Sequence, residues 1–336
     1  MRLLPSTVLH VADPILLPSN RPPERFYRGG RRITDFRGDP PALEREPEDW
    51  VASTTTLNGE TSLGLSALPD GRTLLEAITQ APAEWLGADH LARFGADPRL
   101  LVKLLDAAQR LPVHAHPDGA FAQQNLGRAH GKTEAWYVLS GGEVHLGLKR
   151  DVSTDELTEL VANQNTAVLL PLLHRIPVTA GDVVLVPAGM LHAIGAGVFL
   201  VELQEPEDLS ILLEWKDFAI DGTRDGHLGL GFGIALGAIE LRARTTAEIA
   251  RLARPAGFGP SILPIEADPF FRLERVSVRG AVTLSAGFSV VIVTRGSLTH
   301  VSLSLPQGST LVVPHSAGPL VLSGDGEVVV CRPPAP

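Results

Sequence analysis

Three histidines and one glutamate, set among glycines and prolines, constrain this chain more than any other feature. His114 and His116 are two residues apart, so on a β-strand both side chains point to one face of a sheet. Glu134 follows, and His192 ends the segment 181–192, which contains Gly181, Pro187 and Gly189. Three imidazoles and one carboxylate suit a divalent ion, with zinc first and iron, manganese or nickel as alternatives. A lone histidine on an apolar strand is usually a core or surface residue. Here four candidate ligands fall in two spaced patterns that each contain glycine and proline, and together they predict a metal site.

Length and composition limit the class of protein to which this site can belong. With 336 residues, the chain is long enough for one large or two medium domains. Hydrophobic residues make up 44% and charged residues 20%, which is typical of a globular protein. The net charge of −9 argues against a surface for nucleic acid or anionic membranes, although a local basic pocket remains compatible with it.

Cysteine usage and the start of the chain predict the compartment. Cys331 is the single cysteine, so an intrachain disulfide is excluded and a reducing compartment fits. Residues 1–6 contain no long apolar run, so we expect neither a signal peptide nor a membrane anchor. The sequence therefore predicts a cytoplasmic protein.

Local patterns predict a β-rich chain with a few helices. Residues 1–45 are rich in Pro, Arg and Gly and indicate irregular strands and turns. Helical spacing dominates 73–99, and two shorter helices are expected at 154–163, capped by Thr154, and at 245–252. Strands are expected at 100–107, 182–186, 198–204, 290–294, 310–313 and 328–331.

The spacing of the ligands and of the glycines and proline between them resembles the double motif of the cupin family of small β-barrels. The intervals are six residues from Glu134 to Gly141, five from Gly181 to Pro187 and two from Gly189 to His192. The gap before Glu134 is longer than in simple cupins, with Pro-Asp directly after the second histidine and Lys-Thr directly before the glutamate. In these features, and in segments 26–33, 48–53 and 202–204, the chain resembles the short form of the type I mannose-6-phosphate isomerases.

The resemblance implies a mainly β fold of double-stranded β-helix (cupin, jelly-roll) barrels with a few helices. We expect a catalytic metal-binding cupin domain at 1–240, including the helical segment 73–99, and a C-terminal degenerate barrel at 241–336. The interval from Gly308 to Pro314 repeats the five-residue spacing of the first barrel, but the glycine and histidine that should follow are absent. His300 and His315 are therefore not expected to bind metal.

The function implied by the resemblance is aldose–ketose isomerisation, most simply of mannose 6-phosphate to fructose 6-phosphate. This reaction moves a proton between two carbons through an enediol, and it needs a base and stabilisation of the enediolate oxygens. Lys132 lies two residues before Glu134 and shares its face, so it is the first catalytic candidate. Lys103 lies in an apolar run, where an unpaired amine would be costly, and the family has a lysine there that lines the sugar site. Asp118, close to His116, is a substrate-binding candidate.

The chain departs from the family in the segment after the last ligand. Two family arginines are replaced by Leu212 and Phe218, and the first ligand, usually glutamine, is His114. Glu214, as a catalytic residue, and Lys216, as a substrate-binding residue, are candidates to take over part of the arginines' role, or else they are surface residues. Other cations that would serve the phosphate if the fold brought them to the pocket are Arg31, Arg32, Arg128 and Arg175.

These departures leave other functions open. The first is an isomerase of an unphosphorylated or differently substituted sugar. The second is a cupin dioxygenase with iron on the same ligands, against which Lys132 argues. The third is a sugar-binding cupin without activity. In each isomerase interpretation the partner is a small sugar or sugar phosphate, with no nucleic acid or membrane, and the protein is a monomer or homodimer.

Overall fold

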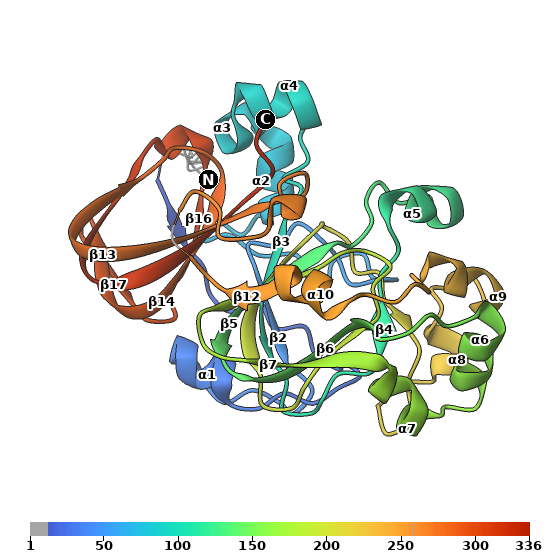
Figure 1. Ribbon diagram of the computed structural model, residues 1–336. Helices are drawn as coiled ribbons and strands as arrows, with labels where there is room; N and C mark the ends of the chain where they lie inside the picture. The colour runs from blue at the N-terminus through green and yellow to red at the C-terminus, as the bar shows by residue number, and fades with distance from the viewer. Residues whose placement is uncertain (1–12, 258) are drawn as a thin grey trace.

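Two β-sheet bodies lie side by side in the computed structural model, which describes residues 13–257 and 259–336 (Figure 1). The first body carries the predicted metal ligands and consists of two antiparallel sheets. One has six strands in the order β12 (Ala253–Pro255), β8 (Asp182–Val186), β5 (Glu134–Ser140), β10 (Phe199–Gln204), β3 (Leu101–Asp106) and β2 (Glu48–Val51). The other has five, in the order β11 (Ile211–Leu212), β4 (His114–Ala115), β9 (His192–Ile194), β6 (Gly142–Leu148) and β7 (Leu173–Val178).

Alternation along the five-stranded sheet directs the histidines inward. His114 pairs with His192 and with Leu212 across neighbouring strands, so these three side chains share one face. Val113 and Ala115 point to the other face, where they are fully buried beneath apolar side chains of the helices that cover the sheet. Four helices gather at this side of the molecule, namely α6 (Thr154–Ala162), α7 (Thr166–Leu169), α8 (Gly222–Asp225) and α9 (Phe232–Ala235) (Figure 1).

The C-terminal sheet forms the second body. Its order is β1 (Ile15–Leu16), β16 (Thr310–Val313), β14 (Ser289–His300), β17 (Leu320–Arg332) and β13 (Arg272–Leu284), with β15 (Leu303–Pro306) also paired to β14. Apolar residues of these strands form a separate buried cluster. His300 hydrogen-bonds the carbonyl of Val321, and His315 packs against Gly87.

The helices are short. They are α1 (Arg32–Arg37), α2 (Leu74–Gln80), α3 (Pro82–Leu86), α4 (Ala88–Phe94), α5 (Gly119–Leu126), α6 (Thr154–Ala162), α7 (Thr166–Leu169), α8 (Gly222–Asp225), α9 (Phe232–Ala235) and α10 (Thr246–Leu252), with 3₁₀ turns η1 (Leu170–Leu172), η2 (Leu236–Ala238), η3 (Ile265–Ala267) and η4 (His315–Ala317).

Most predicted elements are confirmed, with two corrections. The predicted helical segment 73–99 is divided into three helices, because Pro82 starts a new helix and Gly87 adopts a positive φ that ends it. Ser153, not Thr154, caps α6, since its side chain accepts the N–H of Glu156. The expectation of strands and turns alone in 1–45 is wrong, because α1 forms there.

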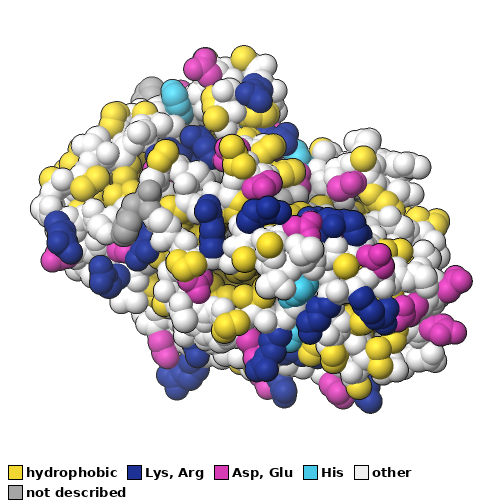
Figure 2. Space-filling view, viewed as in Figure 1, with side chains coloured by type: hydrophobic (Ala, Val, Ile, Leu, Met, Phe, Trp, Pro, Cys, Tyr) yellow, Lys and Arg dark blue, Asp and Glu magenta, His cyan; other side chains and the backbone are white. Residues whose placement is uncertain are grey.

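The division of the chain at residue 240 stays a proposal. Strand β12, at 253–255, still pairs with β8 of the first body, and the strands of the C-terminal body begin with β13. The N-terminal residues 1–6, where no leader is expected, lie outside the described part of the chain. Among the described residues, no helix is long and apolar enough to cross a membrane. Basic and acidic side chains are interspersed on the face shown in Figure 2.

Candidate metal centre

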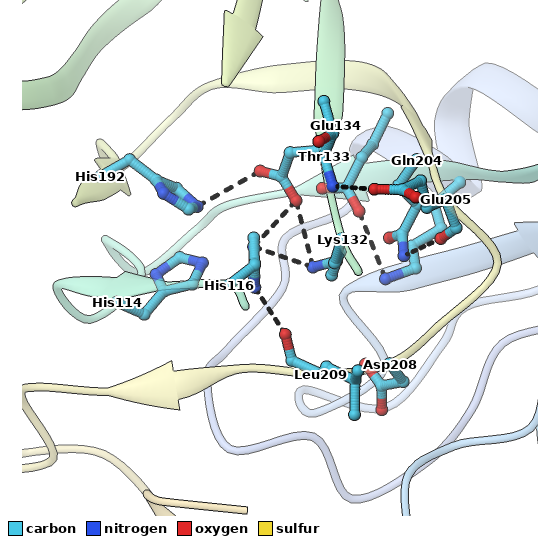
Figure 3. A network of polar contacts seen from close by, with 12 residues as sticks. His114, His116, Lys132, Thr133, Glu134, His192, Gln204, Glu205, Asp208 and Leu209 are labelled. Carbon is cyan, nitrogen blue, oxygen red and sulfur yellow. Dashed lines mark hydrogen bonds and ion pairs between the residues drawn. The ribbon is translucent and has the colours of Figure 1, made fainter. Parts of the chain in front are cut away.

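Three buried imidazoles converge between the two sheets of the first body (Figure 3). One ligand atom from each of His114, His116 and His192 can be chosen so that all three lie within 4.8 Å of one another. The rings of His114 and His192, on paired strands, have centroids 4.0 Å apart. This geometry confirms that the His-x-His pattern places both imidazoles on the inner face. It is the one cluster in 13–257 and 259–336 able to hold a metal.

Backbone carbonyls fix the orientation of each imidazole. The Nδ1 atoms of His114, His116 and His192 lie 2.8, 2.7 and 2.9 Å from the carbonyl oxygens of Pro112, Leu209 and Met190 respectively. A carbonyl only accepts, so each Nδ1 carries the proton and each Nε2 presents a lone pair in the neutral ring. Burial lowers the pKa of His116 to about 3, with Lys132 as the next cause, so the ring is a neutral ligand.

Glu134 faces the histidines from the opposite sheet. Its carboxylate oxygens lie 3.0 Å from Nε2 of His116 and 3.3 Å from Nε2 of His192. The indole N–H of Trp136, two residues along β5, donates to Oε1 at 3.0 Å. Burial opposes ionisation of Glu134, but the charge of Lys132 and contacts with His116 outweigh it and hold its pKa well below the usual range. The predicted set of three nitrogens and one carboxylate is therefore assembled in one place.

Lys132 lies directly beside these ligands. Its Nζ is 3.1 Å from Nε2 of His116 and 3.1 Å from Oε2 of Glu134. The segment before Glu134 is held in place by its backbone. The Lys132 N–H donates to the carbonyl of Pro117 at 3.0 Å, and the Thr133 N–H donates to the carboxylate of Glu205 at 2.8 Å. The amine that sequence reasoning placed on the ligand face is thus at the centre itself.

Lys103 lies in a buried network of charges in the same body. Its Nζ is 3.5 Å from the Glu48 carboxylate and 3.3 Å from the Glu202 carboxylate, and 4.7 Å from the centre of the Trp50 ring. The guanidinium of Arg25 pairs with Glu48 at 3.1 Å. Burial opposes the charge on Lys103, but the two carboxylates raise its pKa above the usual value. The expectation that this lysine faces a carboxylate is confirmed.

Two of the other predicted site residues, Asp118 and Glu214, have structural partners. Asp118 is exposed and caps α5, accepting the N–H of Phe121 at 2.8 Å. The buried carboxylate of Glu214 forms a two-point ion pair with Arg110, at 2.6 and 2.8 Å, and accepts the Val113 N–H at 2.9 Å. Lys216 is exposed. Roles of Asp118, Glu214 and Lys216 in binding or catalysis stay predictions.

The positions of the two lost arginines are apolar in the structure. Leu212 is buried and lines a cavity of about 170 Å³ with Arg25 and Asp208. Phe218 is half-buried, and the guanidinium carbon of Arg110 lies 6.0 Å from the centre of its ring. Neither position supplies a charge to the site.

Sequence reasoning missed several charged residues near the centre. Glu48, Glu202, Arg25 and Asp208 form the network around Lys103, with Arg25 and Asp208 3.6 Å apart. The available signal was an acid inside an apolar strand: Glu202 lies in 198–204, where an unpaired carboxylate is costly. Its register opposite Lys103 makes it the expected partner.

Comparison with known proteins finds relatives that are similar over part or nearly all of the chain. No family model matches the chain. It is 28% identical over 343 residues to the mannose-6-phosphate isomerase of Streptococcus mutans, covering 95% of this chain and 98% of that protein. A second relative, a mannose-6-phosphate isomerase of Bacillus subtilis, is 32% identical over 193 residues, 56% of this chain and 57% of that protein.

The fold agrees with these matches. A crystal structure of the mannose 6-phosphate isomerase from Bacillus subtilis superposes with a TM-score of 0.72, at 23% identity, over 95% of this chain and 99% of that one. The long gap before Glu134 and the Lys-Thr that precedes it are features on which the resemblance depended, and the relatives match both bodies and not the metal motif alone. Over nearly its whole length this chain is similar in sequence to a mannose-6-phosphate isomerase, and it shares the fold of a solved mannose 6-phosphate isomerase.

Proposed function

We propose that the protein is a metal-dependent aldose–ketose isomerase that interconverts mannose 6-phosphate and fructose 6-phosphate. The single observation that carries this proposal is the amine of Lys132, 3.1 Å from both a ligand imidazole and the ligand carboxylate. An isomerase needs a proton-carrying group beside the oxygens that a metal would orient, and this chain provides one there. The names of its relatives supply the substrate.

The residues present fit a divalent ion. The Nε2 atom of His192 is buried and makes no hydrogen bond within the described residues, which is costly unless a cation takes its lone pair. His114, His116, Glu134 and His192 would hold the ion, and zinc is the metal we propose, since nitrogen-rich sets with one carboxylate suit it. Bound there, the ion would polarise the O1 and O2 oxygens of an open-chain sugar.

Side chains around the metal centre would carry protons and position the ligands. Lys132 carries a proton to or from the enediol oxygens, or stabilises the negative charge that develops on one of them. The amine of Lys103 lies between the carboxylates of Glu48 and Glu202 and offsets their negative charge. Trp136 keeps the Glu134 carboxylate in position by its indole hydrogen bond. The monomer-or-homodimer state predicted from the sequence stays a prediction.

Isomerisation of a sugar panel by the zinc-loaded protein tests this proposal. We expect mannose 6-phosphate to turn over and Lys132→Ala to lose about 10²–10⁴-fold in kcat while binding one zinc ion as the wild type does. The matched control is Lys149→Ala, which removes an exposed lysine that donates a hydrogen bond to the backbone carbonyl of Pro171. Tight zinc binding without turnover of any sugar would refute the isomerase assignment.

One alternative keeps support from a specific observation. The cations Arg25 and Lys103 are each engaged by two carboxylates, so neither is free to bind a phosphate. A free sugar is therefore the second candidate substrate, and the panel includes unphosphorylated mannose. The dioxygenase alternative is tested by oxygen uptake of the iron-loaded protein, which an isomerase does not show.

A further inference from the structure

We propose that a cavity between helices α3 and α4 and the C-terminal sheet is a binding site for a small anion, with Arg272 as its main binding residue. The anion that fits is an oxyanion that also carries a hydroxyl group, such as hydrogen phosphate. The cavity has a volume of about 280 Å³, far more than one water molecule needs. None of its described lining residues belongs to the metal centre, so this proposal is independent of the proposed function.

The walls of the cavity come from both bodies of the molecule. His90 of α4 lines one wall and Arg272 of β13 lines the other, and Figure 1 shows α3 and α4 beside the end of β17. His315 and Gly87 also line the cavity, and they join the two walls. The exposed His315 ring packs so closely on Gly87 that a Cβ there would lie 2.6 Å from the imidazole Nδ1. A ligand in this cavity therefore contacts both the helical segment and the C-terminal sheet.

Two arginines lie side by side in the sheet wall. Arg272 of β13 and Arg332 of β17 are register partners in an antiparallel pair, where like charges directly opposite each other are destabilising. The charge of Arg332 is neutralised, because its Nε lies 2.6 Å from the carboxylate of Glu274. Its terminal nitrogens donate to the carbonyls of Gly287 and Ser285, at 3.4 and 2.8 Å. The pair of arginines thus has one carboxylate partner and keeps an excess positive charge.

The excess charge belongs to the half-buried Arg272. Its Nε donates to the carbonyl of Pro333 at 3.1 Å, while its two terminal nitrogens make no hydrogen bond or ion pair within the described residues and are not sealed from solvent. Burial lowers the pKa of Arg272 and the charge of Arg332 adds to this, with Glu274 and Asp268 opposing it in part. An anion beside the guanidinium would relieve this unfavourable charge, and the planar fork suits an oxyanion.

The need for a hydroxyl group on the ligand follows from His90. Its Nε2 lies 2.7 Å from the carbonyl oxygen of Asp97, and a carbonyl only accepts, so Nε2 carries the proton. Burial lowers the pKa of His90, which favours the neutral ring with a lone pair on Nδ1. This Nδ1 makes no hydrogen bond within the described residues and is not sealed from solvent. It can only accept, so a ligand that satisfies both walls has a donor as well as a negative charge.

Two acidic residues that line the cavity leave Arg272 available. The carboxylate of Glu274 is engaged by Arg332 at 2.6 Å. Asp89 is exposed on α4, where water and salt screen its charge. An anion at Arg272 therefore meets one carboxylate that is already paired and one that is screened.

Hydrogen exchange detected by mass spectrometry tests binding at the cavity itself, separately from any binding at the metal centre. The zinc-loaded full-length protein is compared in inorganic phosphate and in chloride of equal ionic strength. At a phosphate concentration ten times its Kd, amides of α4 and of the turn 285–288 whose opening breaks the site should exchange about tenfold more slowly. Sulfate has no hydroxyl group and should protect these amides less at the same concentration.

Two variants assign the binding to this cavity. Arg272→Gln removes the excess charge and should weaken phosphate binding about tenfold or more. The matched control is Arg279→Gln, which removes an exposed arginine from the same strand and should leave the protection unchanged. Ser285→Glu, at an exposed lining position, places a carboxylate in the cavity and should also abolish the protection while both arginines remain.

The proposal is overturned if phosphate does not protect α4 and the turn 285–288 of the wild type. It is also overturned if Arg272→Gln keeps the protection that Arg279→Gln shows. Melting temperatures in chloride show whether each variant is folded. If Arg272→Gln is not folded, Ser285→Glu decides, and full protection in that variant rejects the site.

Discussion

Replacing Lys103 by methionine tests whether the buried charge network stabilises the fold. The lysine amine is the one cation that contacts Glu202 within the described residues, at 3.3 Å, whereas Glu48 keeps Arg25, Tyr27 and Trp50 as partners. Removing one member of a buried ion pair costs about 3–5 kcal/mol, because the other charge stays desolvated. We therefore expect Lys103→Met to lose about 3–5 kcal/mol of unfolding free energy at pH 7.

The loss should depend on pH in a defined direction. Burial raises the pKa of Glu202 from its ordinary 4.5, and Lys103 partly opposes this shift. Without the lysine the folded-state pKa rises further. A carboxyl whose pKa is raised on folding costs nothing below its unfolded value and costs more as pH rises toward the folded one. The deficit of Lys103→Met should therefore be larger at pH 8 than at pH 5.

Urea unfolding at fixed zinc concentration measures both effects. The matched control is Lys149→Met, an exposed lysine for which we expect little change. The double variant Lys103→Met/Glu202→Gln also removes the unpaired carboxylate of Glu202, and it should recover part of the lost unfolding free energy. The reasoning is refuted if Lys103→Met is as stable as the control, or if its deficit does not grow between pH 5 and pH 8.

Three further variants or reactions probe the site and core. Glu214→Gln should lose about 1–3 kcal/mol of stability by breaking the Arg110 pair and leave kcat nearly unchanged; a kcat loss at full stability would instead support the catalytic role predicted from sequence. Gly131→Ala places a Cβ 2.6 Å from backbone atoms of Pro117, Asp118 and Gly119, so it should shift Lys132 and lower kcat; unchanged turnover would contradict this. Burial raises the pKa of the Cys331 thiol, which is fully buried, so iodoacetamide should label it only in urea; labelling of the native protein at the rate of a free thiol would count against the described packing.

How much the sequence predicted depends on how local each feature is. The ligands His114 and His116 follow from a two-residue interval on a strand, and the glycine and proline spacing identified His192 from within one segment. The partners of Lys103 were not named, because Glu48 and Glu202 come from strands far apart in the sequence and only the register of β2, β3 and β10 brings them together. Where neighbouring residues were equally suitable, as for Ser153 and Thr154 at a helix start, the pattern could not choose.

The pairing of β1 with β16 joins two segments that are far apart in the sequence. Ile15 and Leu16 lie in register with Val312 and Leu311, and the guanidinium of Arg37 donates to the hydroxyl of Thr310 at 2.5 Å. Residues in these contacts are as much as 293 positions apart, as for Leu17 and Thr310. During synthesis, β1 therefore has no partner until β16 has left the ribosome.

Such an arrangement sets the order of maturation. The strands of the metal-binding body lie within residues 48–255, whereas the edge of the C-terminal sheet closes later, when β1 pairs with β16. Contacts of this sequence separation form slowly. A nascent chain arrested before residue 310 should accordingly expose its amino-terminal strand to proteases and lose that sensitivity on completion.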